Sequence, residues 1–216
     1  MVHILCKNPS ILNQYIGEIR DVEIQKDSMR FRRNLERIGE IFAMEISREM
    51  QYEEKEVVTP LGIANVPVLT EYPVLATILR AGLPFHQGLL NVFDKSENAF
   101  ISAYRKHHKD GSFTIAVDSL STADATGKVL ILSDVMMATG ASMVYAYREM
   151  LNRGKPSHTH LITILASVEG LDYLKKHLPQ TGVTIWVGVI DDELTAQAYI
   201  VPGLGDAGDL AYGKKI

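Results

Sequence analysis

Residues 129–142 read Val-Leu-Ile-Leu-Ser-Asp-Val-Met-Met-Ala-Thr-Gly-Ala-Ser and contain the strongest structural pattern in the chain. Four apolar residues lead almost directly into Asp134, and Thr139-Gly140 follows five positions later, just before a helix-like pattern. This arrangement predicts a buried strand, a tight turn of small residues and the N-terminus of a helix.

The predicted turn has the chemistry of a phosphate site. Free backbone N–H groups at a helix N-terminus, together with the helix dipole, attract an anion. Asp134 carries the wrong charge for that role and is better suited to accept hydrogen bonds from sugar hydroxyls. The stretch therefore predicts a ribose-phosphate site, and the alternative is an ordinary strand–turn–helix in which Thr139 or Ser142 only caps the helix.

Length and composition limit the classes of protein to which the chain can belong. A chain of 216 residues fits one large domain, and 46% apolar and 22% charged residues are typical of globular proteins. The net charge of −4 argues against general nucleic-acid binding. It does not argue against a small anionic substrate held by a few local arginines.

Cysteine use and hydropathy predict a cytoplasmic protein. The single Cys6 forms no internal disulfide, which favours a reducing compartment. Residues 1–14 lack the basic region and long apolar run of a signal peptide. No apolar stretch approaches the roughly 18 residues of a membrane span, so no membrane contact is expected.

The first third of the chain predicts a long helix and a hairpin. Apolar residues at helical spacing follow Ser28, which predicts an N-cap there and an amphipathic helix to about Met50. Two β-prone runs flank Thr59-Pro60-Leu61-Gly62. Residues 55–68 are therefore predicted to form a hairpin arm.

The rest of the chain predicts an α/β fold. Short apolar runs at 74–79, 99–104, 129–133, 161–166 and 183–189 alternate with helix-like segments at 84–93, 141–153 and 169–177. This alternation predicts a central, mainly parallel sheet with helices on both faces. The glycine-rich tail from residue 191 is predicted to be loop, and the acidic run Asp191-Asp192-Glu193 within it a solvated turn.

Three charged residues each follow a predicted strand: Arg80, Arg105 and Asp134. In an open parallel sheet, ligands bind beyond the carboxyl ends of the strands. These side chains are therefore predicted to meet at one edge of the sheet, where a guanidinium fork suits phosphate oxygens. The alternative is that they cap strands and face water.

The motifs resemble those of a known family. Residues 134–142 resemble the phosphoribosyl-pyrophosphate (PRPP) loop of the type I phosphoribosyltransferases. Residues 199–209, Tyr-Ile-Val-Pro-Gly-Leu-Gly-Asp-Ala-Gly-Asp, narrow the resemblance to the uracil phosphoribosyltransferases. Residues 78–83 (Ile-Leu-Arg-Ala-Gly-Leu) and 103–105 (Ala-Tyr-Arg) also resemble that family, in the expected order. The resemblance covers most of the chain, and the C-terminal run is its most specific part.

The resemblance implies a PRPP site. Backbone amides of residues 137–142 would bind the 5′-phosphate with help from the Thr139 and Ser142 hydroxyls, and Asp134 would bind the ribose hydroxyls. The implied PRPP-binding set is Arg80, Arg105, Asp134, Val135, Met136, Met137, Ala138, Thr139, Gly140, Ala141, Ser142 and Asp206. The chain departs from the usual family wording at Val135, Met137 and Ala141. The added methyl of Ala141 is tolerable if its φ is negative, as at a helix start.

The resemblance also implies a uracil site formed by Ile200, Gly205, Asp206 and Ala207, with Arg105 and Asp206 as catalytic residues. Asp206 would approach PRPP through Mg²⁺ or water. Residues 203–208 match G-x-G-x-x-G literally, but Pro202 precedes them and eight residues follow Gly208. This context excludes a dinucleotide fingerprint, which needs a preceding strand, a following helix and a later acid.

Residues 106–126 are predicted to form a mobile lid, because they are polar and end in a run of small residues. His107 and His108 do not predict a metal site, since adjacent side chains face different sides and no partner cluster is evident. The expected cofactor is Mg²⁺ carried by PRPP, with no metal held by the protein itself.

The expected function is transfer of the 5-phosphoribosyl group from PRPP to N1 of uracil, giving UMP and pyrophosphate. Two alternatives stay open: a phosphoribosyltransferase for another base, and a catalytically weak regulator that binds RNA or a protein. The expected organisation is one domain over residues 1–216, with the hairpin arm, the lid and a base-binding segment at 191–216. The resemblance implies a homodimer or a higher homo-oligomer.

Overall fold

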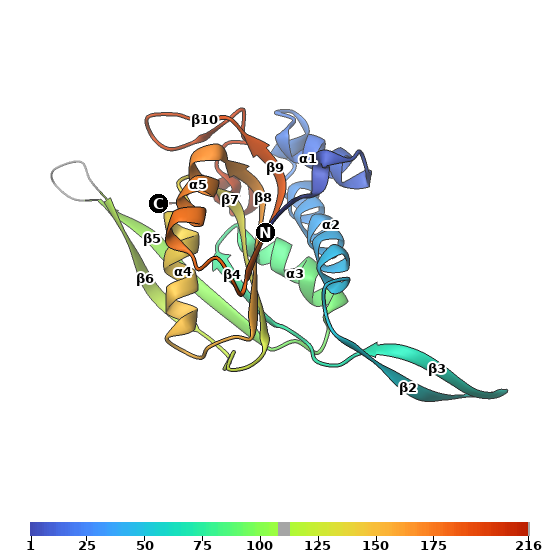
Figure 1. Cartoon of the computed structure of the whole chain (residues 1–216). Helices are drawn as coiled ribbons and strands as arrows, with labels where there is room; N and C mark the ends of the chain where they lie inside the picture. The colour runs from blue at the N-terminus through green and yellow to red at the C-terminus, as the bar shows by residue number, and fades with distance from the viewer. Residues whose placement is uncertain (108–112, 216) are drawn as a thin grey trace.

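The computed structural model describes residues 1–107 and 113–215, with the backbone alone for the strand residues between 103 and 119. A seven-stranded sheet forms its centre, in the order β1-β9-β8-β7-β4-β5-β6 (Figure 1). Neighbouring strands pair in parallel except β6, which runs antiparallel to β5. The strands are β1 (Val2–Ile4), β4 (Val74–Leu79), β5 (Asn98–His107), β6 (Phe113–Ser121), β7 (Val129–Met137), β8 (His158–Ser167) and β9 (Val183–Asp191).

Helices cover both faces of the sheet (Figure 1). One layer contains α1 (Ile11–Arg20), α2 (Ser28–Ser47) and α3 (Gly82–Val92), and the other contains α4 (Ala141–Leu151) and α5 (Val168–His177). Successive side chains of a strand point to opposite faces. Ile131 of β7 accordingly joins the core under the first layer, whereas Leu130 and Leu132 join the core under the second. The predicted α/β architecture is confirmed.

The N-cap of α2 differs from the prediction. The Asp27 carboxylate accepts hydrogen bonds from the N–H groups of Met29 (3.0 Å) and Arg30 (3.1 Å). Ser28 is the first helical residue, and the helix ends at Ser47. A carboxylate one position earlier reaches the free N–H groups of the first turn and adds negative charge at the positive end of the helix dipole.

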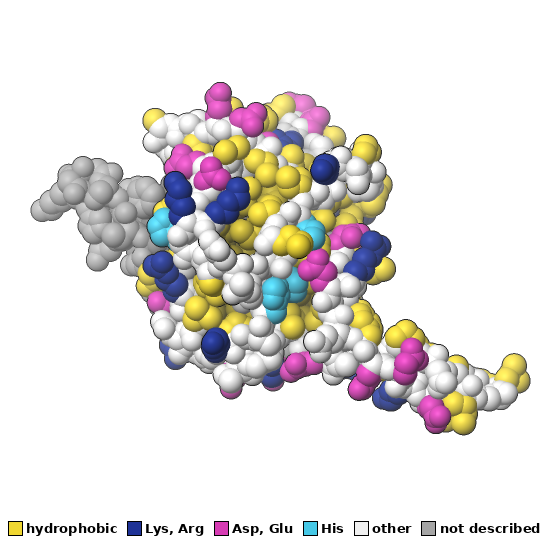
Figure 2. Space-filling view, viewed as in Figure 1, with side chains coloured by type: hydrophobic (Ala, Val, Ile, Leu, Met, Phe, Trp, Pro, Cys, Tyr) yellow, Lys and Arg dark blue, Asp and Glu magenta, His cyan; other side chains and the backbone are white. Residues whose placement is uncertain are grey.

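The predicted hairpin is present and longer than expected. Strands β2 (Tyr52–Thr59) and β3 (Gly62–Leu69) pair along their whole length and project from the domain (Figure 1). Figure 2 shows hydrophobic and acidic side chains along this arm. A two-stranded ribbon has no core of its own, so its exposed apolar side chains are available to another surface.

Other differences concern strand length and the tail. Strand β7 continues to Met137, so Asp134 lies inside the strand rather than after it, and Arg105 likewise lies within β5. Strand β6 occupies much of the predicted lid, of which residues 108–112 lie outside the described part. The tail is not all loop, because it forms β10 (Glu193–Leu194), β11 (Ile200–Val201) and α6 (Ala207–Tyr212). Among the described helices, none is both long and apolar enough to span a bilayer.

Candidate functional site

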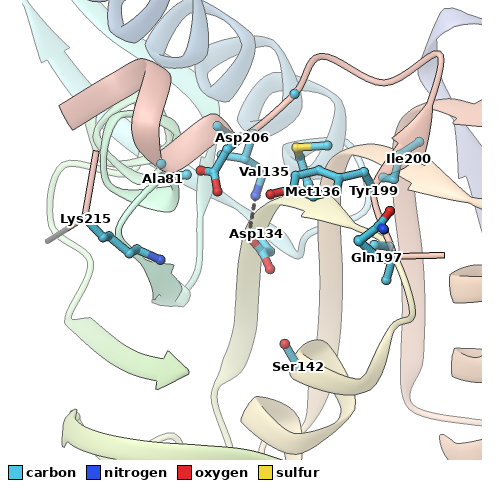
Figure 3. Close-up of a pocket in the computed structure, with 15 residues that line it drawn as sticks. Ala81, Asp134, Val135, Met136, Ser142, Gln197, Tyr199, Ile200, Asp206 and Lys215 are labelled. Atoms are coloured by element: carbon cyan, nitrogen blue, oxygen red, sulfur yellow. Dashed lines mark hydrogen bonds between the residues drawn. The ribbon is translucent and has the colours of Figure 1, made fainter. Parts of the chain in front are cut away.

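A cavity of about 530 Å³ lies at the carboxyl ends of the central strands (Figure 3). Two segments that are far apart in the sequence contribute all but one of its lining residues. The first is the end of β7 with its connection to α4, and the second is the C-terminal segment. The lining residues are Ala81, Asp134, Val135, Met136, Ala138, Ser142, Gln197, Ala198, Tyr199, Ile200, Gly205, Asp206, Ala207, Gly208 and Lys215.

Residues 138–142 form the turn between β7 and α4, here called the phosphate turn. Gly140 is the N-cap of α4 with a φ of 76°, a left-handed conformation that favours glycine. Ala141 is the first helical residue and is not among the residues with positive φ, so its methyl group is accommodated without strain. The conformation that the sequence required of Ala141 is present.

The start of α5 supports the phosphate turn from behind. The Ser167 hydroxyl donates to the carbonyl of Ala138 and accepts a hydrogen bond of 2.8 Å from the N–H of Gly170. A Cβ atom at Gly140 would lie 2.7 Å from the Gly170 carbonyl, and one at Gly170 would overlap the Ala138 carbonyl. Two glycines therefore let the two backbones touch, and the turn is fixed by this close approach.

The phosphate turn offers unpaired donors. The N–H groups of Ala138, Thr139 and Gly140 donate no hydrogen bond to any residue that the structure describes. The Ser142 hydroxyl lines the cavity beside them (Figure 3). Unpaired N–H groups at the N-terminus of a helix are suited to bind a phosphate.

Asp134 lines the cavity and is half-buried. Burial raises the pKa of Asp134 to about 7, and hydrogen bonds from the backbone N–H groups of Val135 and Met136 oppose this shift. The Val135 bond measures 2.7 Å. A carboxylate with so little solvation gains from any hydroxyl donors that a ligand brings.

The C-terminal segment closes the cavity from the opposite side. Asp206 is the N-cap of α6, and its carboxylate accepts a 2.9 Å hydrogen bond from the N–H of Asp209. Ala207 is the first residue of α6, and its N–H donates no hydrogen bond to any residue that the structure describes. Figure 3 shows Asp134, Asp206 and Lys215 facing the same space.

Arg80 follows β4, as predicted, but α6 already engages it. Its Nη2 donates to Asp209 Oδ1 (3.1 Å) and to the Gly213 carbonyl (3.3 Å). Its Nε is buried without a hydrogen-bond partner among the described residues. The guanidinium thus keeps an unused donor next to the cavity. Arg105 lies in β5 opposite Ile115 of β6, and its side chain is outside the described part of the structure.

Most of the predicted site residues are brought together. Nine of them line the cavity: Asp134, Val135, Met136, Ala138, Ser142, Ile200, Gly205, Asp206 and Ala207. Thr139, Gly140 and Ala141 belong to the adjoining turn, whereas the Met137 side chain is buried in the core. Six further residues line the cavity without having been predicted as site residues: Ala81, Gln197, Ala198, Tyr199, Gly208 and Lys215. Four of them lie in the connection before β11 or at residue 215, where no pattern of spacing marks a site.

The prediction of a solvated turn at residues 191–193 is wrong for Asp191. This carboxylate is only 6% exposed and forms an ion pair with Arg20. Asp192 and Glu193 are exposed, as expected. The partner Arg20 is far away in the sequence, so the acidic run alone gave no indication of the pair.

Comparison with known proteins assigns the chain to a family. The profile of the family described as uracil phosphoribosyltransferase matches residues 7–214, almost the whole chain. The chain belongs to the uracil phosphoribosyltransferase family. Family members include the uracil phosphoribosyltransferase of Porphyromonas gingivalis, which is 52% identical over 207 residues, covering 96% of this chain and 95% of that protein.

A more distant member of the uracil phosphoribosyltransferase family comes from Methanothermobacter thermautotrophicus. It is 36% identical over 190 residues, covering 87% of this chain and 86% of that protein. Among solved structures, the AQ2163 protein from Aquifex aeolicus superposes with a TM-score of 0.87 at 28% identity, and each chain is covered completely. The fold described above is thus shared along its full length.

Proposed function

We propose that this protein transfers the 5-phosphoribosyl group from PRPP to N1 of uracil, giving UMP and pyrophosphate. The observation that carries the proposal is that the phosphate turn and the glycine-rich C-terminal segment line one and the same cavity. The relatives from Porphyromonas gingivalis and Methanothermobacter thermautotrophicus bear the name of this activity. The single Cys6 and the small polar substrates fit an enzyme of the cytoplasm.

The phosphate turn and Asp134 would hold the ribose 5-phosphate. The unpaired N–H groups of Ala138, Thr139 and Gly140 are suited to bind a dianion, and the Ser142 hydroxyl adds a further donor. Asp134 would accept hydrogen bonds from the 2′- and 3′-hydroxyls. Binding at both ends fixes the ribose ring and therefore the position of its anomeric carbon.

The reaction needs no protein nucleophile. PRPP loses pyrophosphate through an oxocarbenium-like transition state while uracil N1 attacks the opposite face of the sugar. The chain would contribute orientation, exclusion of water and positive charge near the departing diphosphate. Arg80 would supply this charge once a diphosphate replaces Asp209 as its partner. The resemblance assigns Arg105 the same role.

The main chain of residues 200–207 would read the base. Ile200 and Ala207 are 3% and 5% exposed, so a ring between them loses its water. Uracil presents an acceptor at O4 and a donor at N3, and cytosine reverses both. Since each unsatisfied buried group costs roughly 1–3 kcal/mol, cytosine should be poorer by about two to four orders of magnitude.

The acidic groups of the cavity fit Mg²⁺ that arrives on PRPP. Asp134 and Asp206 line the cavity, but no group of three or more His, Cys, Asp or Glu suited to a metal is found among the described residues. Mg²⁺ keeps much of its water and commonly takes one or two carboxylates together with substrate phosphates. Asp206 would contact this ion directly or through water, and the ion would supply charge neutralisation of the diphosphate.

The hairpin arm supports a homodimer or a higher homo-oligomer. Val58, Leu61 and Ile63 near its tip are 84%, 101% and 68% exposed. A projecting apolar ribbon is suited to pack on a second copy of the chain. The lid role of residues 106–126 stays a prediction.

A base-panel assay tests the proposed function. Purified protein would be incubated with PRPP, Mg²⁺ and uracil, cytosine, thymine, adenine, guanine or hypoxanthine, and pyrophosphate release followed. We expect turnover with uracil and, with cytosine, a rate at least about 100-fold lower. Faster turnover with another base would identify a different phosphoribosyltransferase. Binding of UMP without any turnover would favour the regulator.

A further inference from the structure

Asp191 forms a two-pronged ion pair beneath the C-terminal segment. It is the last residue of β9, and Arg20 is the last residue of α1. Arg20 Nη2 lies 2.8 Å from Asp191 Oδ1, and Arg20 Nη1 lies 3.0 Å from Asp191 Oδ2. The planar guanidinium and the carboxylate thus fix each other's orientation as well as their distance.

The same ion pair holds both polar backbone groups of Gly203. The N–H of Gly203 donates to Asp191 Oδ2 (3.0 Å), and Arg20 Nη1 donates to the Gly203 carbonyl (3.3 Å). Gly203 has a φ of 56°, and a Cβ atom there would overlap the carbonyl of Ile200. Contacts at its N–H, its carbonyl and its Cα therefore fix the backbone orientation of Gly203.

Gly203 lies between the two parts of the proposed uracil site. Ile200 precedes it and Gly205 to Ala207 follow it, and these flanks line the cavity while Gly203 itself does not. Arg20 and Asp191 also lie outside the lining. The ion pair thus holds the turn from its back and leaves the face toward the cavity free.

We infer that Arg20 and Asp191 are positioning residues for base recognition, acting through Gly203. This inference rests on the proposed function of residues 200–207 as the base site. Main-chain hydrogen bonds select a base only if the peptide groups keep a fixed orientation and stay within about 0.5 Å of the required positions. A turn released from the ion pair would still be present, but its donors and acceptors would no longer converge.

A change in the ion pair between Arg20 and Asp191 should affect the binding of uracil and of PRPP differently. Ser167 and the contact between Gly140 and Gly170 hold the phosphate turn, and neither involves Arg20 or Asp191. Asp206, which would also contact PRPP, is held by the N–H of Asp209 and not by the ion pair. A change in the ion pair should therefore affect the base and leave PRPP binding nearly unchanged. A purely structural role would instead lower the stability and the use of both substrates together.

The test compares Asp191→Asn and Arg20→Lys with the matched control Asp192→Asn, an exposed acid one position along. Steady-state kinetics would give KM for uracil, KM for PRPP and kcat, together with the uracil-to-cytosine ratio, well below each variant's unfolding temperature. We expect Asp191→Asn to raise KM for uracil roughly tenfold or more and to narrow the base ratio. KM for PRPP should stay within about twofold, and Asp192→Asn should match the wild type.

Arg20→Lys keeps the positive charge but loses one of the two hydrogen bonds to Asp191. It should therefore raise KM for uracil and narrow the base ratio as Asp191→Asn does, but by a smaller factor. It also provides the readout if Asp191→Asn does not fold. Unchanged KM for uracil in either folded variant, or equal rises in both KM values, would overturn the inference. If the wild type prefers another base, the proposed function fails, and the inference is then judged with that base against PRPP.

Discussion

The phosphate turn is held by glycine backbone contacts and one serine hydroxyl within one half of the chain, whereas the C-terminal segment is held by arginines from distant parts of the chain. Ser167 is only 29 residues from Ala138, to which it donates. By contrast, Arg80, Arg20 and Arg32 reach across 129, 171 and 179 residues to Asp209, Asp191 and the Ala211 carbonyl. The cavity thus has one wall held mainly by close backbone packing, here called the rigid wall, and one wall held by charged side chains.

The two walls should respond differently when PRPP binds. The phosphate turn keeps its conformation without a ligand, because glycine contacts and a serine hydroxyl need no charge to keep their geometry. The opposite wall includes Arg80, whose partner Asp209 competes with any diphosphate for the guanidinium. Binding of PRPP would therefore change the contacts of the second wall more than those of the first.

The largest expected effect comes from breaking the rigid wall with Gly140→Ala. The alanine would have to adopt the left-handed φ of 76°, and its Cβ would lie 2.7 Å from the Gly170 carbonyl oxygen. Such strain displaces the N–H groups that would bind the phosphate, so kcat/KM for PRPP should fall by more than about 100-fold. The control is Gly182→Ala, which has a φ of 77° but open space around the new Cβ. Equal activity losses in both variants would show that strain alone, and not the turn, is responsible.

Asp134→Asn removes the charge and keeps the shape at the centre of the cavity. Loss of one charged hydrogen bond costs roughly 1.5–3 kcal/mol, so kcat/KM for PRPP should fall by about 10- to 150-fold. Because the pKa of Asp134 is raised to about 7, kcat/KM of the wild type should also decline as the pH falls below about 7. This decline should be absent in the variant. Wild-type kinetics in a folded variant would refute the role of Asp134.

The free energy of unfolding should change with pH in the direction opposite to kcat/KM, again because of Asp134. Its pKa is raised by burial from 3.8 to about 7, so the folded state keeps a proton that the unfolded chain releases. The free energy of unfolding should therefore fall as the pH rises from about 4 to about 7 and stay level above that. The upper bound is roughly 4 kcal/mol at about 1.36 kcal/mol per pKa unit. Urea unfolding without ligand should show Asp134→Asn to be more stable than the wild type at pH 8 and about equal below pH 4.

Ala207→Pro tests the opposite wall at a single donor. Proline is tolerated at the first position of a helix, and the extended conformation of Asp206 (φ −93°, ψ 104°) suits a residue before proline. The variant should fold and lose only the free N–H of residue 207. KM for uracil should rise roughly tenfold, with KM for PRPP unchanged. An unchanged KM for uracil would remove this N–H from the list of base contacts.

The smallest effect is expected for Ile200→Val. Ile200 is 3% exposed and packs in the core beside the cavity, so loss of one methylene should cost roughly 0.5–1.5 kcal/mol of stability. KM for uracil should change by less than about threefold, and cytosine should remain as poor as in the wild type. A reversed base preference would show that side chains, and not the main chain, read the base.

The sequence predicted the rigid wall better than the other one, for a physical reason. A buried strand, a small-residue turn and a helix start follow one another along the chain, so their pattern reveals residues 129–142 without any distant partner. The resemblance then implied roles for Asp134, Ile200, Gly205, Asp206 and Ala207, and all five line one cavity in the structure. Tyr199 and Lys215 were missed, because only the folded tail brings them to that space.

The other differences have two causes, distant contacts and elements that are too short or too polar to show a pattern. Asp191 looked like part of a solvated acidic turn, since nothing near it in the sequence announces Arg20. Helix α6 was missed because its six residues are too few to show a helical period. Strand β6 escaped notice because polar residues interrupt its pattern, and an antiparallel strand at the edge of a sheet needs little apolar content.

A crystal structure of the protein with UMP would test most directly whether the two walls form one substrate site. We expect the phosphate on the N–H groups of residues 138–142, the ribose hydroxyls on Asp134, and the uracil ring against the main chain of residues 200–207. Arg20, Asp191 and Gly203 should keep the contacts that they have without ligand. UMP bound outside this cavity, or uracil read by side chains alone while the C-terminal segment moves away, would contradict the account.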